Sequence, residues 1–122
     1  MLRAPFVPSV LLHQHVHMYH SCPLPNRHSW ACIDPAVFID DDGQAYLTWG
    51  NRECYIVKLK DNMIETEGEV KRIHIDESHP FTEAPWIHKY NGKYYLTYAS
   101  EWPEKIAYAV ADTLKARMKR KG

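Results

Sequence analysis

Residues 81–98 read FTEAPWIHKYNGKYYLTY, and this stretch decides the fold that the sequence predicts. At its centre Asn91-Gly92 separates two runs that are rich in aromatic and β-branched residues. Asn-Gly in this position is a strong hairpin signal, because glycine accepts the positive φ that a tight turn requires. We therefore predict two antiparallel strands joined by a short turn.

The same pattern occurs earlier, in residues 33–50, which read IDPAVFIDDDGQAYLTWG. Here an Asp-Gly pair separates two strand-like runs, which is again a hairpin signal. Superposing Gly43 on Gly92 gives an offset of 49 residues, because 92 − 43 = 49. At this offset the Tyr-Leu-Thr runs of the two stretches coincide, and Asp34 coincides with Glu83.

Further strand-like runs follow each hairpin, at residues 54–59, 68–73 and 105–110. A repeat of about 40–50 residues that holds three or four short strands is typical of a propeller blade. The alternative is a pair of unrelated hairpins in a small sandwich. We predict an all-β fold with about two β-propeller blades, which is an incomplete propeller, since repeat proteins generally need about three or more units.

Composition separates an N-terminal segment from the rest of the 122 residues. Residues 1–33 contain no Asp or Glu, yet they hold five of the eight histidines. We predict an irregular segment at residues 1–30 and a partial propeller domain at residues 31–122. Imidazole groups at alternating positions could bind a transition metal, but we interpret them as part of a solvated segment and assign no metal site to His13, His15, His17 and His20.

Several classes of partner and location are disfavoured by charge and hydropathy. Fifteen Lys and Arg residues balance fifteen Asp and Glu residues, which argues against a nucleic-acid binder. No apolar run approaches the roughly 18 residues of a membrane span. Residues 1–12 do not resemble a secretory signal, because Pro8 interrupts their apolar run. The sequence leaves the location unknown: cytoplasmic, or secreted if the parent gene carries a signal. Three cysteines without CxxC spacing indicate neither a disulfide framework nor a zinc ribbon.

Asp34 and Glu83 precede the first strand of their respective units. Because the first strand of each blade lines the central channel of a propeller, these two carboxylates are expected to face one pocket. A pair of carboxylates beside aromatic rings suggests glycoside hydrolysis, in which one carboxyl group must stay protonated. Repulsion between like charges raises the pKa of one partner. The alternative is that both residues make only local backbone hydrogen bonds at the start of a loop.

Both stretches resemble motifs of glycoside hydrolase family 43. Residues 33–50 resemble its second-carboxylate motif and residues 81–98 its general-acid motif, and the likeness extends from about Ala31 to Thr113. The resemblance implies a five-bladed β-propeller that inverts configuration with three carboxylates, acting on arabinosides or xylosides of hemicellulose and pectin. It implies that Asp34 modulates the pKa and orients the acid, and that Glu83 is the general acid. No cofactor is required, although some members hold calcium in the channel of the complete propeller.

The sequence also departs from the family, because the family's catalytic base comes from an earlier blade. No acidic residue precedes Asp34, so we expect a truncated α-L-arabinofuranosidase/β-xylosidase-like enzyme in which the isolated chain has little activity. The alternative is a non-catalytic carbohydrate-binding or assembly module. We expect a pentose-containing oligo- or polysaccharide as partner, with Trp86 contacting the sugar.

Two further expectations concern the open blades and the acidic turn. Open blade edges and an uncovered apolar flank favour association with other chains, so we expect a homo-oligomer. The run Asp40-Asp41-Asp42-Gly43 lacks the later ligands of an EF-hand loop, and we interpret it as a tight hairpin turn and not as a calcium site.

Overall fold

The computed structural model describes residues 32–76, 78–114 and 117–120. These residues are all-β, as predicted, and no helix among them is long and apolar enough to cross a membrane. The predicted irregular segment at residues 1–30, with its histidine cluster, lies outside the described residues. The strands are β1 (Ala36–Ile39), β2 (Ala45–Trp49), β3 (Cys54–Leu59), β4 (Thr66–Ile75), β5 (Phe81–Tyr90), β6 (Lys93–Ser100), β7 (Lys105–Ala111) and β8 (Arg117–Arg120).

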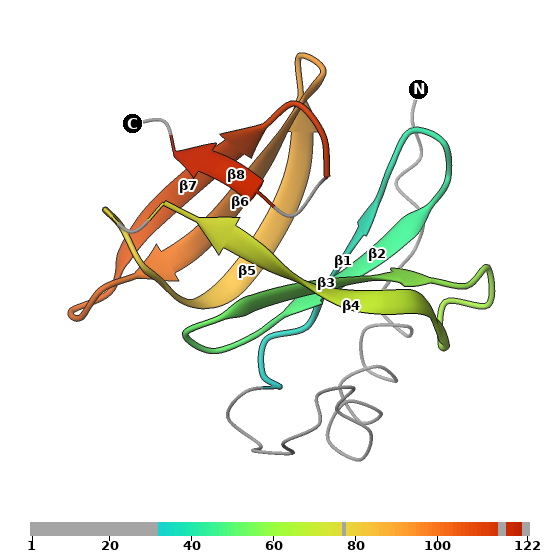
Figure 1. The fold of residues 1–122 in the computed structure, drawn as a ribbon, viewed down its shortest axis with the longest axis horizontal. Helices are drawn as coiled ribbons and strands as arrows, with labels where there is room; N and C mark the ends of the chain where they lie inside the picture. Colours follow the sequence, from blue (N-terminus) through green and yellow to red (C-terminus); the bar gives the residue numbers. More distant parts are fainter. Residues whose placement is uncertain (1–31, 77, 115–116, 121–122) are drawn as a thin grey trace.

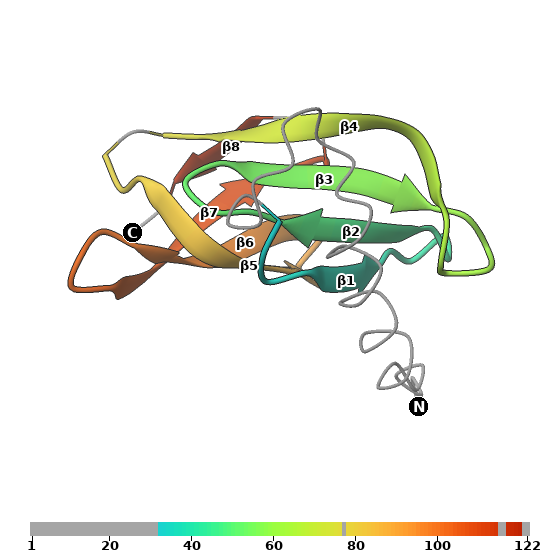
Figure 2. The same cartoon turned by 90° about the horizontal axis from the view of Figure 1, so that it is seen from below.

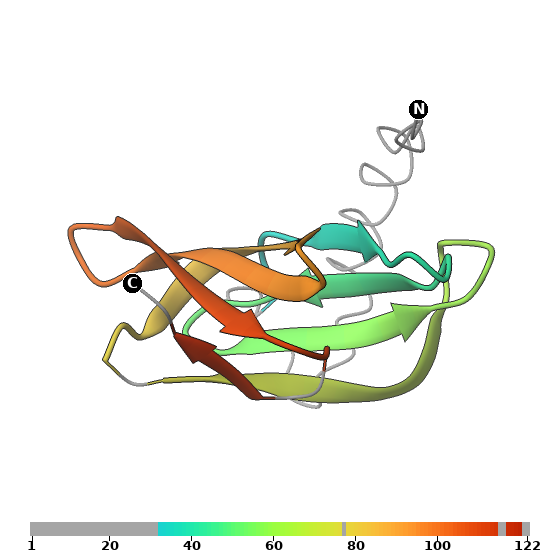
Figure 3. The same ribbon diagram turned by 90° about the horizontal axis from the view of Figure 1, so that it is seen from above.

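The strands form two four-stranded antiparallel units in chain order, β1–β4 and β5–β8. Parallel pairing of β4 with β8 joins the units, so the strand order is β1-β2-β3-β4-β8-β7-β6-β5. In Figures 1, 2 and 3 the second unit lies on the left and the first on the right, and β4 runs from the first unit toward β8. The first strands of the units, β1 and β5, are in contact with each other.

A hydrophobic cluster fills the space between the units. It combines side chains of the first unit with side chains of the second, namely Cys54, Ile56, Ile73, Phe81, Ile87, Leu96, Tyr98, Ala107 and Ala109. Leu96 is completely buried and Tyr98 almost so. Burial of one such side chain contributes about 1.5–3 kcal/mol relative to exposure, so this shared cluster helps to hold the two units together.

The opposite face of the first unit has a cluster of its own. Trp49 is fully buried there and its ring stacks on Tyr55 at 5.7 Å between centroids. The same cluster includes Cys32, which is disulfide-bonded. Cys54, in the cluster between the units, is a free thiol whose pKa burial raises to about 12. The cysteine spacing gave no sign of this disulfide.

The two hairpins are present where the sequence predicts them, but their loops differ by one residue. Asn91-Gly92 is a two-residue turn with φ of 48° and 71°, which is the geometry of a type I′ turn. In the first hairpin the N–H of Gly43 donates to the carbonyl of Asp40 at 2.9 Å, and Gly43 has φ of 85°. This is a three-residue loop that closes with a glycine bulge.

The extra loop residue corrects the predicted alignment of the two units. Thr48 pairs with Ala36, whereas Thr97 pairs with Trp86, so the offset is 49 residues after the turn (97 − 48) and 50 before it (86 − 36). Asp34 therefore corresponds to Ala84 and not to Glu83. The backbone agrees, since Asp34 and Ala84 have φ of 54° and 57°.

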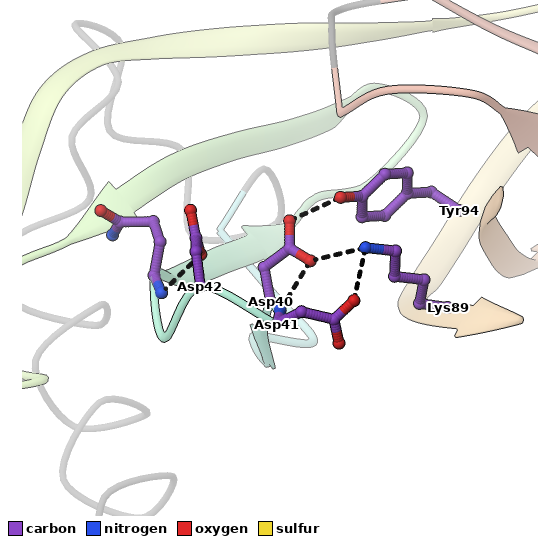
Figure 4. Close-up of polar contacts among 6 residues, drawn as sticks. Asp40, Asp41, Asp42, Lys89 and Tyr94 are labelled. Carbon is purple, nitrogen blue, oxygen red and sulfur yellow. Dashed lines mark hydrogen bonds and ion pairs between the residues drawn. The ribbon is translucent and has the colours of Figure 1, made fainter. Parts of the chain in front are cut away.

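The loop of the first hairpin also connects the two units through charged groups, as Figure 4 shows. Lys89 Nζ lies 2.6 Å from Asp41 Oδ2 and 3.3 Å from Asp40 Oδ1. The hydroxyl of Tyr94 donates to Asp40 Oδ2 at 2.6 Å. The Asp42 carboxylate instead accepts from the N–H of Gln44 inside the loop. The acidic run is thus a hairpin turn, as predicted.

These contacts change how Asp40 titrates. Burial raises its pKa, but hydrogen bonds from the Tyr94 hydroxyl, the Asp41 N–H and the Lys89 ammonium group outweigh burial, and the resulting pKa is below the usual 3.8. The pKa of Lys89 is raised, mainly by its hydrogen bond with Asp41. A carboxyl group with a lowered pKa stabilises the folded state above its ordinary pKa, and this stability is lost as the pH falls through the lowered value.

Replacing Tyr94 with Phe removes the hydroxyl donor and keeps the ring. We expect Tyr94→Phe to lower the free energy of unfolding by about 1.5–3 kcal/mol at neutral pH, as for other hydrogen bonds to charged groups. The difference from the wild type should shrink as the pH falls below 3.8 and through the lowered pKa of Asp40. Urea unfolding at several pH values measures both effects. Tyr90→Phe is the matched control, because Tyr90 is 64% exposed, and an equal loss in that variant would contradict the assignment.

Candidate active site

Four chain segments meet at the end of the two units that is opposite to the acidic turn. They are the residues before β1, the connection between β2 and β3, the first half of β5, and the turn between β6 and β7. Six non-glycine residues of the described part have positive φ, and four of these lie in the four segments, one in each, namely Asp34, Arg52, Ala84 and Glu101. Such backbone conformations cost about 1–3 kcal/mol each and tend to cluster at functional sites.

The connection between β2 and β3 holds the two segments that carry the predicted site residues. The N–H of Gly50 donates to the carbonyl of Ile33 at 3.0 Å, and the N–H of Arg52 donates to the carbonyl of Thr82 at 2.7 Å. Ile33 and Thr82 directly precede Asp34 and Glu83 in the sequence. One short loop therefore fixes the backbone before both carboxylates.

Glycine is required at the start of this loop. Gly50 has φ of 141°, and a Cβ atom added to it would lie 1.9 Å from the carbonyl oxygen of Glu53. The adjacent Asn51 adds a side-chain contact, since its Nδ2 donates to Glu83 Oε2 at 3.3 Å. Glu53, at the other end of the loop, forms an ion pair with Arg72 at 2.9 Å and accepts a hydrogen bond from Tyr55. Both ends of the loop are thus anchored.

Glu83 lies in an irregular part of β5, because the pairing register shifts on both sides of it. Such bulges change the direction in which a side chain points. The pKa of Glu83 is raised, most of all by burial, then by the negative charges of Glu104 and Asp34. A side-chain hydrogen bond with Glu104 raises it further, while the hydrogen bond from Asn51 lowers it. A raised pKa of this kind is what a general acid requires.

A hollow of about 370 Å³ opens on the second unit, and its lining includes Ala84, the residue that directly follows Glu83. Ala84 and Trp86 line it from β5, and Glu104 and Ile106 line it from the turn and β7. Trp86 is 57% exposed and adjoins this hollow. An exposed indole next to carboxyl groups has an apolar face for a sugar ring and lies close to groups that bind hydroxyls.

The negative charge of Asp34 therefore acts on Glu83 and raises its pKa. Trp86 lies three residues after Glu83 on the same strand, β5. Sequence reasoning missed Asn51 and Glu104. Asn51 directly follows the first motif, and Glu104 belongs to a turn without a motif of its own. Among the described residues no group of three or more His, Cys, Asp and Glu side chains could hold a metal ion.

The sequence profile of Glycosyl hydrolases family 43 matches residues 13–120. Xylosidase/arabinosidase 43A of Humicola insolens is 33% identical over 64% of this chain and 37% of its own length. The beta-xylosidase of Xylanibacter ruminicola is 33% identical over 72% of this chain and 39% of its own length. This chain thus spans under two fifths of either relative.

Solved structures show the same likeness. An α-L-arabinofuranosidase from Clostridium thermocellum superposes with a TM-score of 0.65 and 40% identity, over 73% of this chain and 30% of that one. A β-xylosidase/α-arabinofuranosidase from a compost metagenome, solved in complex with xylotriose, has a TM-score of 0.68 and 30% identity. The superposed part covers 74% of this chain and 40% of the solved chain. These neighbours are five-bladed β-propellers, and the prediction of a partial propeller is confirmed.

The role of Gly50 can be tested by one substitution. Backbone strain at a positive φ costs about 1–3 kcal/mol. We expect Gly50→Ala to lower the free energy of unfolding by more than this, because the new Cβ also meets the Glu53 carbonyl. Gly92→Ala is the matched control, since it also has positive φ but nothing within 4 Å of the added Cβ. Urea denaturation measures both. Equal losses in the two variants would show that the close approach at Gly50 does not constrain the loop.

Proposed function

The chain belongs to the glycosyl hydrolases of family 43, and from this premise we propose that it carries the acid side of an inverting glycosidase site. Glu83 is the general acid, and Asp34 modulates its pKa and orients it. The raised pKa of Glu83 supports this assignment most directly. In inverting hydrolysis the acid protonates the leaving-group oxygen, while a second carboxylate activates a water molecule on the opposite face of the sugar.

The proposed substrate is a pentoside of hemicellulose, of the α-L-arabinofuranoside or β-xyloside type. Support comes from the relatives, which are described as xylosidases and arabinosidases, and from a neighbour solved with xylotriose. In this proposal Trp86 contacts the sugar, because its exposed ring lines the same hollow as Ala84 and Glu104. The chemistry is proton transfer between carboxyl groups, sugar and water, so it requires no cofactor, and no step passes through a metal ion.

The family's catalytic base precedes the residue that corresponds to Asp34. Residues 1–33 contain no Asp or Glu, so they do not provide this base. We expect little turnover of phenyl arabinofuranoside or phenyl xyloside by the 122-residue chain. Azide, a small nucleophile that needs no base, should restore product formation. It attacks the anomeric carbon as the bond to phenol breaks, and Glu83 gives its proton to the phenol oxygen.

The azide-dependent rate tests the role of Glu83. We expect Glu83→Gln to lower it by about 10²–10⁴-fold, the usual contribution of general acid catalysis, and the exposed control Asp112→Asn to leave it unchanged. The measurement is phenol release with and without azide. Binding of xylotriose without azide-dependent turnover would favour a non-catalytic carbohydrate-binding module instead. Robust activity without azide that disappears in Glu83→Gln would mean that a second copy supplies a base.

We also propose that the chain forms homo-oligomers. β1 and β5 stand at the two ends of the strand order, and each leaves one edge unpaired within the described sheet. The outer face of the second unit exposes Tyr90 and Tyr108, and between them Tyr95 stacks on His88 with centroids 5.2 Å apart. Exposed edges and large apolar patches recruit other chains. The proposed occupant is a second copy of this chain, seated at the Tyr90 end of the face, away from Trp86.

Light scattering at high micromolar concentration tests this association. We expect a mass that is a multiple of 14.3 kDa for the wild type, and a monomer for the double variant Tyr90→Glu/Tyr108→Glu. Ile64→Glu is the matched control, because Ile64 is a half-exposed apolar residue in the other unit. A sharp monomeric mass for the wild type would contradict the proposal, and so would an oligomer that persists in the double variant.

A further inference from the structure

The turn between β6 and β7 brings a third carboxylate to Glu83. β6 ends at Ser100, β7 begins at Lys105, and these two residues pair with each other. Because Ser100 also pairs with Phe81 and Ala99 with Glu83, the turn stands directly beside the irregular part of β5. Glu104 is the last residue of this turn.

We propose that Glu104 is the positioning residue of the general acid: its carboxylate accepts a hydrogen bond from the protonated Glu83 and keeps the acid in place beside the hollow before the sugar enters. The inference rests on the proposed function, because it assigns Glu104 a task in the same site. Glu104 lines the hollow together with Ala84 and Trp86, which follow Glu83 on β5, and a side-chain interaction with Glu104 is among the causes that raise the pKa of Glu83.

The neighbouring cation, Lys105, pairs with Glu101 and not with Glu104, so the charge of Glu104 can act on Glu83. Lys105 Nζ lies 3.2 Å from Glu101 Oε2, at the other end of the same turn. No ion pair joins Glu83, Glu104 or Asp34 to a cation within the part of the chain that the structure describes. The groups that act on Glu83 are therefore two carboxylates, Glu104 and Asp34, and the amide of Asn51.

Two carboxyl groups that share a hydrogen bond must hold at least one proton between them, because two carboxylates would repel each other. Burial disfavours the charged form of Glu83, whereas Glu104 lies exposed to water. The shared proton therefore belongs on Glu83. When the sugar enters, its glycosidic oxygen replaces the Glu104 carboxylate as the acceptor, and the Glu83 O–H bond breaks as the proton passes to that oxygen.

The titration of the Glu83 carboxyl carbon, followed by NMR in the 122-residue chain, tests the inference without any need for activity. Glu104→Gln removes the charge and the acceptor carboxylate, and we expect it to lower the pKa of Glu83 more than Asp34→Asn does. Glu104→Asp keeps the charge but shortens the side chain, so its effect should be intermediate. Asp112→Asn is the matched control and should leave the titration unchanged, because Asp112 is exposed at the end of β7.

The outcomes separate the two proposals. If the pKa of Glu83 is the same in Glu104→Gln as in the control Asp112→Asn, Glu104 is not the positioning residue. A shift of the Glu83 pKa in Asp34→Asn would still support the pair of Asp34 and Glu83. If no variant shifts the titration, the shared pocket itself is wrong. Because Glu104 is exposed, its replacement should preserve the fold, and unchanged signals of the buried Leu96 and Tyr98 verify this. Displaced signals of those two residues would mean that Glu104 supports the fold, and this too would overturn the inference.

Discussion

The loop between β2 and β3 is the constraint on which the rest of the site depends. Its main-chain N–H groups at Gly50 and Arg52 bind the carbonyls that directly precede Asp34 and Glu83. The loop closes so tightly at Gly50 that no Cβ fits there. The backbone of both carboxylates is thus positioned by hydrogen bonds that are independent of their own side chains. The side chains remain available for proton transfer.

The two ends of the paired units show how environment decides the state of a carboxyl group. Asp40 lies between Lys89 and Tyr94, and these donors lower its pKa in spite of burial. Glu83 is partly buried among other carboxyl groups, and its pKa is raised. One end of the molecule therefore joins the two units through ionised groups. The other end has a carboxyl group whose pKa is raised by burial and by neighbouring negative charges, which is the arrangement expected where acids and bases react.

Sequence alone predicts the hairpins and the repeat because turn chemistry is local. Asn-Gly and Asp-Gly accept the positive φ that a tight turn requires, and Gly43 and Gly92 both have it, so both turns lie where the pattern places them. The one-residue difference between the loops is not readable, because it depends on the hydrogen bond from Gly43 to Asp40. Asn51 and Glu104 escape prediction for a different reason. Asn51 lies in the first unit and reaches Glu83 only after the two units have packed together, whereas Glu104 reaches it through the pairing of β5, β6 and β7 within the second unit.

The packing between the units finally explains how β5 can carry an irregular segment. Phe81 and Ile87 are buried in the shared cluster on either side of Glu83. The approach to β5 is fixed as well, since the Tyr98 hydroxyl and Ser100 Oγ donate to the carbonyls of His79 and Pro80 at 2.8 and 2.7 Å. Because the strand is anchored at both ends, the residues between these anchors can leave regular pairing at limited cost. The hydrophobic core thus holds both ends of the irregular segment in place, and the bulge between them directs Glu83 toward the carboxylates of Asp34 and Glu104.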